Sequence, residues 1–192
     1  MQVRLTANDL ACRRGERLLF RRLSLDLAPG EALHVTGPNG IGKSSLLRIL
    51  AGLSRPFAGE ATHTGRVALL DERLALDEAL PLARALAFWR RLDGAQDFTP
   101  LDRLALTDLL DVPVRYLSTG QRKRAAMARV LGARAAIWLL DEPLNGLDDE
   151  ARGTVERLAV EHCAGGGICV VASHQAFAVE GKQVLALSEY AE

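Results

Sequence analysis

The sequence has no excess of either charge. Its 24 Lys and Arg residues match its 24 Asp and Glu residues, so the formal net charge is zero. A protein that binds mainly to nucleic acid usually carries an excess of positive charge, because its contacts are made to phosphates. The balance therefore removes the simplest argument for a nucleic-acid-binding protein, and the basic run Arg-Lys-Arg at 122–124 needs another explanation.

Cysteine is scarce as well. The three residues of this type, Cys12, Cys163 and Cys169, are odd in number and form no C-x-x-C pair. A disulfide framework uses an even set of cysteines, and a zinc knuckle uses closely spaced pairs. We therefore expect the three cysteines to be small apolar residues in or near a core, in a reducing compartment.

Long apolar runs are also missing. The N-terminal segment "MQVRLTANDL" lacks the apolar stretch of a signal peptide. Apolar runs such as "AAIWLL" and "ICVVAS" fall far short of the about 20 residues that a membrane-spanning helix needs. We expect a soluble chain, which leaves contact with a membrane protein open. The 192 residues, without internal repeats or linkers, fit a single domain over 1–192.

The spacing of apolar residues changes along the chain. The first third alternates apolar and polar residues, as half-buried strands do, and then passes through "ALHVTG" into a Gly-rich loop and a helix. Between about 77 and 117, apolar residues recur every three or four positions, which predicts two short helices joined by "DGAQDFTP" and inserted into the main body. After residue 118, helices alternate with buried strands, which predicts an α/β fold with a parallel sheet covered on both faces.

The segment "GPNGIGKS" at 37–44 matches the phosphate-loop pattern G-x-x-x-x-G-K-[ST] between a predicted strand and a predicted helix. Its glycines let successive backbone N–H groups point inward, where they bind phosphate together with the positive helix end. We expect Lys43 to reach the β- and γ-phosphates and Ser44 to hold Mg²⁺. A Gly-rich turn with Lys43 in solvent is the alternative. The candidate nucleotide-binding residues are Gly37, Pro38, Asn39, Gly40, Ile41, Gly42, Lys43, Ser44 and Ser45.

Two further apolar strands end in polar side chains. "AIWLLDEP" runs into Asp141 and Glu142, and "ICVVASHQ" runs into His174. Parallel strands bring these ends to the edge of the sheet where phosphate loops lie. There Asp141 can hold Mg²⁺, Glu142 can act on the water that attacks the γ-phosphate, and His174 can donate to that phosphate. The alternatives are two exposed acids that cap a turn before Pro143, and a structural histidine.

Five motifs then stand in order along the chain, namely "GPNGIGKS", "LSTGQ", "WLLDEP", "NGLD" and "ASH". Their order resembles the nucleotide-binding subunit of ABC transporters over nearly the whole chain. The resemblance implies the P-loop NTPase fold of ABC ATPases, with a mostly parallel core sheet, an antiparallel β subdomain and a short helical subdomain. The short chain, the Trp of "IWLLDEP" and the segments "GQRKR" and "SHQ" are similar to the ATPase of the haem exporter of cytochrome c maturation, the CcmA family.

The resemblance also implies a reaction and a set of partners. The chain would hydrolyse ATP to ADP and phosphate with Mg²⁺, as a head-to-tail homodimer. Residues Ser118, Thr119, Gly120 and Gln121, here called the signature motif, would contact the γ-phosphate of ATP held by the other subunit, and Asp148 would be the D-loop acid that links the two sites. Membrane permease subunits of the haem exporter would hold the chain peripherally at the cytoplasmic face of the bacterial inner membrane. No nucleic acid would bind, and the basic run at 122–124 would be a solvated helix face.

Two positions depart from the family pattern. Glu72, beside Asp71, stands where ABC ATPases have a Gln that senses Mg²⁺ and the membrane partner, and a carboxylate there can still bind Mg²⁺. Arg14 stands near the position of the aromatic residue that stacks on adenine, and an Arg plane can also stack on a base.

Three alternatives remain open at this point: the ATPase of another small exporter, a soluble ABC-type ATPase acting on nucleic acid or ribosomes, and a catalytically inactive assembly module. We expect no haem site in the chain itself. It has no C-x-x-C-H motif, and its four histidines are scattered.

Overall fold

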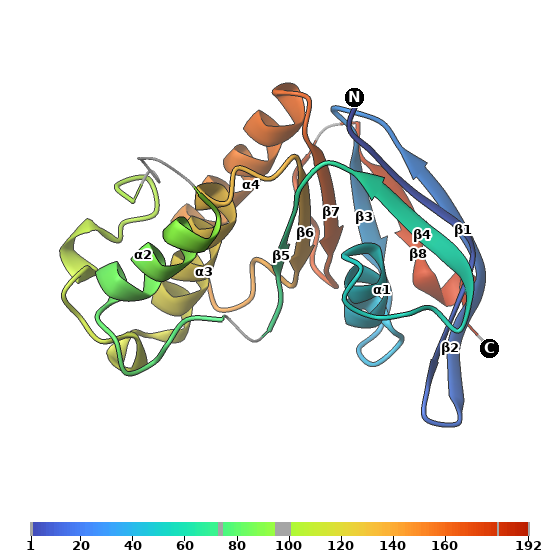
Figure 1. Ribbon diagram of the computed structural model, residues 1–192, viewed down its shortest axis with the longest axis horizontal. Helices are drawn as coiled ribbons and strands as arrows, with labels where there is room; N and C mark the ends of the chain where they lie inside the picture. Colours follow the sequence, from blue (N-terminus) through green and yellow to red (C-terminus); the bar gives the residue numbers. More distant parts are fainter. Residues whose placement is uncertain (1, 73–74, 95–100, 180, 192) are drawn as a thin grey trace.

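Two β-sheets organise the residues that a computed structural model describes, which are 2–72, 75–94, 101–179 and 181–191. One sheet has three antiparallel strands in the order β2-β1-β4, and the other has five parallel strands in the order β5-β6-β7-β3-β8. Figure 1 shows helix α1 between the two sheets and helices α2, α3 and α4 on the opposite face of the parallel sheet. The structure thus confirms the predicted fold class.

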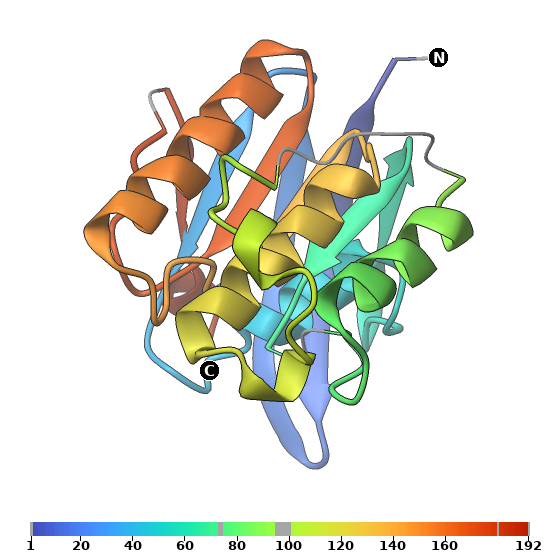
Figure 2. The same ribbon diagram turned by 90° about the vertical axis from the view of Figure 1, so that its left-hand side faces the viewer.

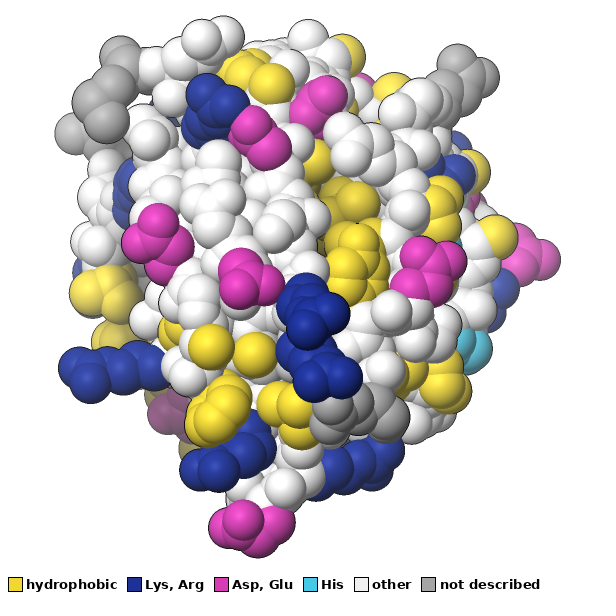
Figure 3. Space-filling view, turned by 90° about the vertical axis from the view of Figure 1, so that its right-hand side faces the viewer, with side chains coloured by type: hydrophobic (Ala, Val, Ile, Leu, Met, Phe, Trp, Pro, Cys, Tyr) yellow, Lys and Arg dark blue, Asp and Glu magenta, His cyan; other side chains and the backbone are white. Residues whose placement is uncertain are grey.

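The antiparallel sheet comes from the alternating segments at the N-terminus. Its strands are β1 (Arg4–Arg14), β2 (Arg17–Leu27) and β4 (Ala58–Thr64). The inward side chains of β1 and β2, such as Leu5 and Phe20, are fully buried against α1, while the other side chains of these strands face solvent. On the side of the molecule seen in Figure 3, charged side chains of both signs are interspersed with hydrophobic ones, in keeping with the neutral net charge.

The three central strands of the parallel sheet, β6, β7 and β3, are buried on both faces. Its strands are β3 (Ala32–Thr36), β5 (Val67–Leu70), β6 (Ile137–Asp141), β7 (Ile168–Ala172) and β8 (Gln183–Ala186). Along β6, Ile137 and Leu139 pack toward α1, whereas Trp138 and Leu140 pack toward α3 and α4. This alternation explains why the strand reads as an unbroken apolar run, since each face has its own core.

Four α-helices cover the parallel sheet in the part of the chain that the structure describes. They are α1 (Lys43–Leu50), α2 (Leu82–Leu92), α3 (Thr119–Gly132) and α4 (Asp149–Ala164). In Figure 2, α3 and α4 lie across the sheet and α2 lies beside α3. Three short 3₁₀ turns complete the described elements, at Thr107–Leu109, Val114–Tyr116 and Leu187–Tyr190.

The prediction of a second helix between 77 and 117 was wrong. Residues 101–112, the described part of "TPLDRLALTDLLDV", form turns with 3₁₀ hydrogen bonds, because Ala105 has a positive φ of 48° and Pro113 cannot continue a helix. Its apolar residues Leu104 and Leu106 are nevertheless buried. The first predicted helix begins only at Leu82, after Pro81, and most of the predicted loop, 95–100, lies outside the described residues.

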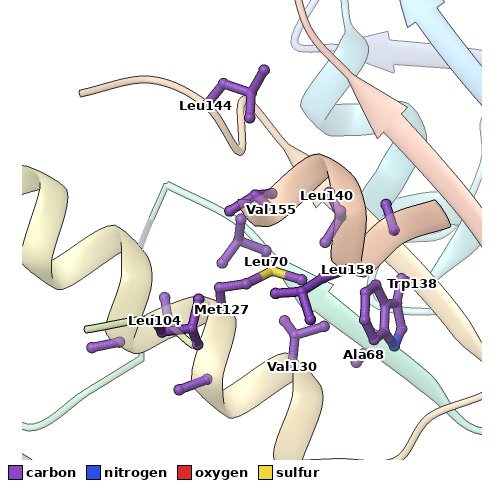
Figure 4. Close-up of a cluster of buried hydrophobic side chains, with 14 of the residues drawn as sticks. Ala68, Leu70, Leu104, Met127, Val130, Trp138, Leu140, Leu144, Val155 and Leu158 are labelled. Carbon is purple, nitrogen blue, oxygen red and sulfur yellow. The ribbon is translucent and has the colours of Figure 1, made fainter. Parts of the chain in front are cut away.

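The core on the helical side of the sheet is centred on Met127 of α3. This side chain is 1% exposed and lies between the helices and the sheet, near Leu158 of α4 and Leu70 of β5 (Figure 4). Trp138 of β6 extends the same cluster to the base of α4, where its ring stacks on His162 at 4.0 Å between centroids. The cluster fastens α3, and with it the signature motif at its start, to the sheet.

We predict that Met127→Ala lowers the free energy of unfolding by about 2–5 kcal/mol, because it removes buried apolar atoms and leaves a cavity between α3 and the sheet. Urea unfolding followed by circular dichroism measures the change. Leu92→Ala is the control, since Leu92 is 66% exposed and its truncation should change stability by no more than about 0.5 kcal/mol. Equal losses in both variants would contradict the packing described here.

Candidate functional site

The loop between β3 and α1 curls around the Lys43 ammonium. Lys43 is 6% exposed, and its Nζ donates to the backbone oxygens of Gly37 at 2.8 Å and Pro38 at 3.4 Å. The loop packs closely against Phe20 because Gly42, at the start of α1, has no side chain. Its φ is 118°, and a Cβ there would lie 3.2 Å from the Phe20 ring. The backbone therefore holds Lys43 over the centre of the loop.

The strand register brings the other candidates to the same edge. Ala172 of β7 is level with Val35 of β3 on one side and with Asp141 of β6 on the other. Because the three strands are parallel and adjacent, the residues after them emerge together. The phosphate loop, the pair Asp141-Glu142 and His174 thus meet at the carboxyl edge of the sheet, as the sequence predicted.

Glu142 is the most highly connected side chain of this edge. Its carboxylate lies 3.6 Å from the Lys43 Nζ, accepts a hydrogen bond from the Ser173 hydroxyl at 3.1 Å, and lies 3.0 Å from the His174 Nδ1. Its backbone has a φ of 44°, an unfavourable conformation for a residue with a side chain, and its N–H is held by the oxygen of Ala172 at 2.8 Å. The fold thus maintains a strained backbone in order to aim this carboxylate at the loop.

Asp141, unlike Glu142, has a carboxylate oxygen without a partner. The residue is 2% exposed, and its Oδ1 makes no hydrogen bond. Burial raises the pKa of Asp141, and the nearby carboxylates of Glu72 and Glu142 raise it further, while a hydrogen bond with Ser44 lowers it. A buried carboxylate oxygen without a partner, next to a hydroxyl, is a donor set that suits a hard cation such as Mg²⁺. In the described part of the chain, no three His, Cys, Asp or Glu side chains group around a metal position, so phosphate oxygens and water must complete such a site.

A cavity of about 490 Å³ opens between these groups. It is large enough for a nucleotide. Its lining includes most of the predicted site residues, namely Asn39, Gly40, Gly42, Lys43, Ser44, Ser45, Glu72, Asp141, Glu142 and His174. Arg14 lines its far end together with Arg17 and Leu19 of β2. Gly37 and Pro38 contribute through their carbonyl groups to Lys43, and Ile41 packs beneath the loop against the core.

The signature motif does not line this cavity. Ser118 caps α3, where its hydroxyl accepts from the Gln121 N–H at 3.2 Å and its own N–H donates to the Gln121 side chain at 2.8 Å. Gly120 packs so tightly that a Cβ would lie 2.7 Å from the backbone oxygen of Gly146. Asp148 caps α4 by accepting from the Ala151 N–H at 2.8 Å. Within one chain, these residues build helix starts, and Ser118 and Thr119 remain exposed.

Sequence analysis missed Ser173 and the pair Asn145 and Gln175. Ser173 is fully buried and orients Glu142, while the Gln175 amide donates at 3.0 Å to Asn145, which lines the cavity. No spacing rule identifies these three residues, because their roles depend on neighbours about 30 positions away. The signal that was available for Ser173 is its place at the end of the buried run "ICVVAS".

The prediction that residues 122–124 form a solvated helix face was wrong for Lys123. This residue is 8% exposed, because it lies on the same side of α3 as the buried residues Ala126, Met127 and Val130. Arg124 is occupied as well, donating to the backbone oxygen of Leu104 at 2.8 Å. The three- and four-residue spacing from Lys123 to these apolar residues was the signal in the sequence that Lys123 lies on the buried face of the helix.

Comparison with known proteins finds relatives that match most of the chain. The family model described as ABC transporter matches residues 20–145. The protein named "Cytochrome c biogenesis ATP-binding export protein CcmA" from Novosphingobium aromaticivorans is 59% identical over 97% of this chain and 96% of its own length. The protein of the same name from Sphingopyxis alaskensis is 52% identical over 93% of this chain and 94% of its own. A putative ABC transporter ATP-binding protein from Pyrococcus furiosus, 22% identical, superposes with a TM-score of 0.84 over 98% of this chain and all of its own, which shows the shared fold.

We predict that Asp141→Asn stabilises the nucleotide-free protein at neutral pH. Because burial raises the pKa of Asp141 above its unfolded value, the folded state binds the proton more tightly, and stability falls as the pH rises between the unfolded and the folded pKa. The neutral amide avoids this cost, so its urea midpoint at pH 7 should exceed that of the unmodified protein, and the difference should shrink in acid. Asp149→Asn, at an exposed helix start, is the control. A lower midpoint for Asp141→Asn at pH 7 would show that the carboxylate is stabilising.

Proposed function

The chain belongs to the ABC transporter family and, within it, to the CcmA proteins, and on this basis we propose that it powers an export step of cytochrome c biogenesis. As a member of this family, it is an ATP-binding and ATP-hydrolysing subunit. The observation that carries the proposal is the joint arrangement of Lys43 and Glu142 at the sheet edge, in a chain 59% identical to a named export protein over nearly its full length. The cargo that we propose is haem.

We assign the steps of hydrolysis to the residues around the cavity. Lys43 and the N–H groups of residues 37 and 39–45 bind the β- and γ-phosphates, and the Arg14 plane contacts the base. Ser44 and Asp141 would hold Mg²⁺, with Glu72 lining the same cavity, and the ion would supply positive charge to the phosphate oxygens. Glu142 accepts the proton of the attacking water, while Ser173 and His174 keep its carboxylate in place. In the bound complex, His174 also donates to the γ-phosphate.

The phosphates of ATP then compete with groups of the protein for the Lys43 ammonium. Without nucleotide, that ammonium contacts two loop carbonyls and the Glu142 carboxylate. A phosphate carries more negative charge than any of these partners, so it draws Lys43 away and leaves Glu142 free to take up water. Activation of the base thereby depends on occupation of the site.

We propose that a second copy completes each site. The signature residues Ser118, Thr119, Gly120 and Gln121 lie at the start of α3, outside their own cavity, with Ser118 and Thr119 exposed. The first N–H groups of a helix bind an anion well, which suits the γ-phosphate held by a partner copy in a head-to-tail homodimer. Asp148 follows Gly146 by two residues, and Gly120 packs against Gly146, so Asp148 can link the two sites.

A membrane partner is needed for transport. No helix among the described residues is long and apolar enough to cross a membrane. We propose that permease subunits of the haem exporter hold this chain peripherally at the cytoplasmic face of the bacterial inner membrane. We further propose that 1–192 is one nucleotide-binding domain, in which the helical insertion of about 77–117 faces that partner.

The cargo path lies outside this chain in our proposal. All four histidines are already engaged: His34 with the Ser173 oxygen at 3.3 Å, His63 with the Gly65 oxygen at 3.1 Å, His162 with the Trp138 ring, and His174 with Glu142. The alternative function on nucleic acid or ribosomes is disfavoured, because Lys123 is buried and Arg124 is bonded to the backbone, so the basic run does not form a phosphate-binding surface.

Deleting the gene in its native bacterium tests the proposed function. We expect haem staining of membrane and periplasmic fractions to lose the c-type cytochromes, while b-type cytochromes remain. A plasmid copy should restore them, and a copy with Glu142→Gln should not, because the base is missing. Glu150→Gln, an exposed acid at the start of α4, is the matched control and should restore fully. Normal c-type cytochromes in the deletion strain would refute the proposal.

A further inference from the structure

Lys123 is a buried cation that hydrolysis, as assigned above, does not use. It lies on α3 five positions after Ser118 and is 8% exposed. Within the described part of the chain, no hydrogen bond or ion pair holds its ammonium. Taking an ammonium out of water without a partner is costly, so its retention on an inward helix face calls for a counter-charge nearby.

A second cavity, of about 660 Å³, contains that counter-charge. Lys123, Arg122 and Thr119 line it from α3, and Glu72 and Glu78 line it from the segment that follows β5. Glu72, Glu142 and Asn145 line both this cavity and the candidate ATP cavity. The two cavities are therefore neighbours that share two carboxylates and one amide, and Lys123 lines the second cavity only.

Two acids both line this cavity and act on the charge of Lys123, namely Glu72 and Glu142, and only Glu142 has a cation beside it among the described residues. Asp71 pairs with Arg48 at 2.7 Å, and Glu142 lies 3.6 Å from Lys43. No ion pair among the described residues involves Glu72. Burial lowers the pKa of Lys123, while Asp141, Glu142, Glu72 and Asp71 act against that change. Lys123 and Glu72 thus line one cavity, and neither has an ion pair among the described residues.

We propose that Lys123 is a positioning residue that holds Glu72 across the second cavity and neutralises it beside the bound nucleotide. This deepens the proposed function, on which it rests. The pair connects α3, which carries the signature motif, to the segment after β5 at the edge of the ATP site. Without Lys123, the Glu72 carboxylate faces the triphosphate uncompensated and repels it.

The test is a double-mutant cycle in nucleotide binding with the purified full chain. A fluorescent ATP analogue is titrated into the unmodified protein, Lys123→Gln, Glu72→Gln and the double variant, with and without Mg²⁺. We expect Lys123→Gln to weaken binding about tenfold when Glu72 is present and less than about threefold when residue 72 is Gln. Lys123→Arg should bind within about threefold of the unmodified protein, since the cavity admits the larger cation.

Arg122→Gln is the matched control, because Arg122 lines the same cavity and precedes Lys123 on the helix but is half-buried. It should change binding less than about twofold. Equal losses for Lys123→Gln in both backgrounds would overturn the proposal, because Lys123 would then act on the nucleotide directly. Equal losses for Lys123→Gln and Arg122→Gln would also overturn it, because only the overall charge would matter.

Urea unfolding of the same four proteins without nucleotide provides the second readout. The losses caused by the two single substitutions should not add in the double variant, because each removes the same contact. Additive losses would overturn the proposal, and this result stands even for a variant that binds no nucleotide. Neither measurement depends on export. If Lys123 and Glu72 show no coupling but the protein still restores c-type cytochromes, the positioning role of Lys123 is rejected and the proposed function is not.

Discussion

The contact between the Lys43 ammonium and the Glu142 carboxylate joins the two halves of the site. Lys43 comes from the helix that follows β3, and Glu142 comes from the turn that follows β6, with β7 between them. Their separation of 3.6 Å depends on the parallel register of these three strands, and therefore on the two cores that bury the sheet on both faces. The antiparallel sheet packs α1 from one side, and the Met127 cluster fastens α3 from the other.

Several unfavourable features gather at this one edge. Asp141 is buried with an oxygen that lacks a partner, Glu142 has a positive φ, and Lys123 is buried without an ion pair among the described residues. Each costs stability in the protein without nucleotide, and the Asp141 carboxylate lines the cavity where a cation can offset its charge. A site assembled from such groups gains more from its ligand than one whose charges are already matched, which is how ATP binding can drive a change elsewhere.

Much of this arrangement is readable from the sequence because it is local or periodic. The phosphate loop lies between a strand and a helix, and the buried runs before Asp141 and His174 become adjacent parallel strands. Sequence reasoning failed where tertiary packing decided the outcome. The segment around Ala105 has helical spacing but turns, since a positive φ and Pro113 interrupt it while its leucines still reach the core. Lys123 was assigned to the surface by its charge, although its spacing to Met127 and Val130 put it on the buried face.

The most direct test of the whole account is the mass of the Glu142→Gln protein in sedimentation equilibrium, with and without Mg²⁺ and ATP. The substitution keeps the shape of the side chain, leaves Lys43 to bind phosphate and removes the base, so ATP stays bound. We expect a dimer of about twice 20.8 kDa with ATP, and no such dimer with ADP or when Lys43→Ala is added. A Glu142→Gln protein that hydrolyses ATP at the normal rate, or that binds ATP and remains a monomer, would contradict it.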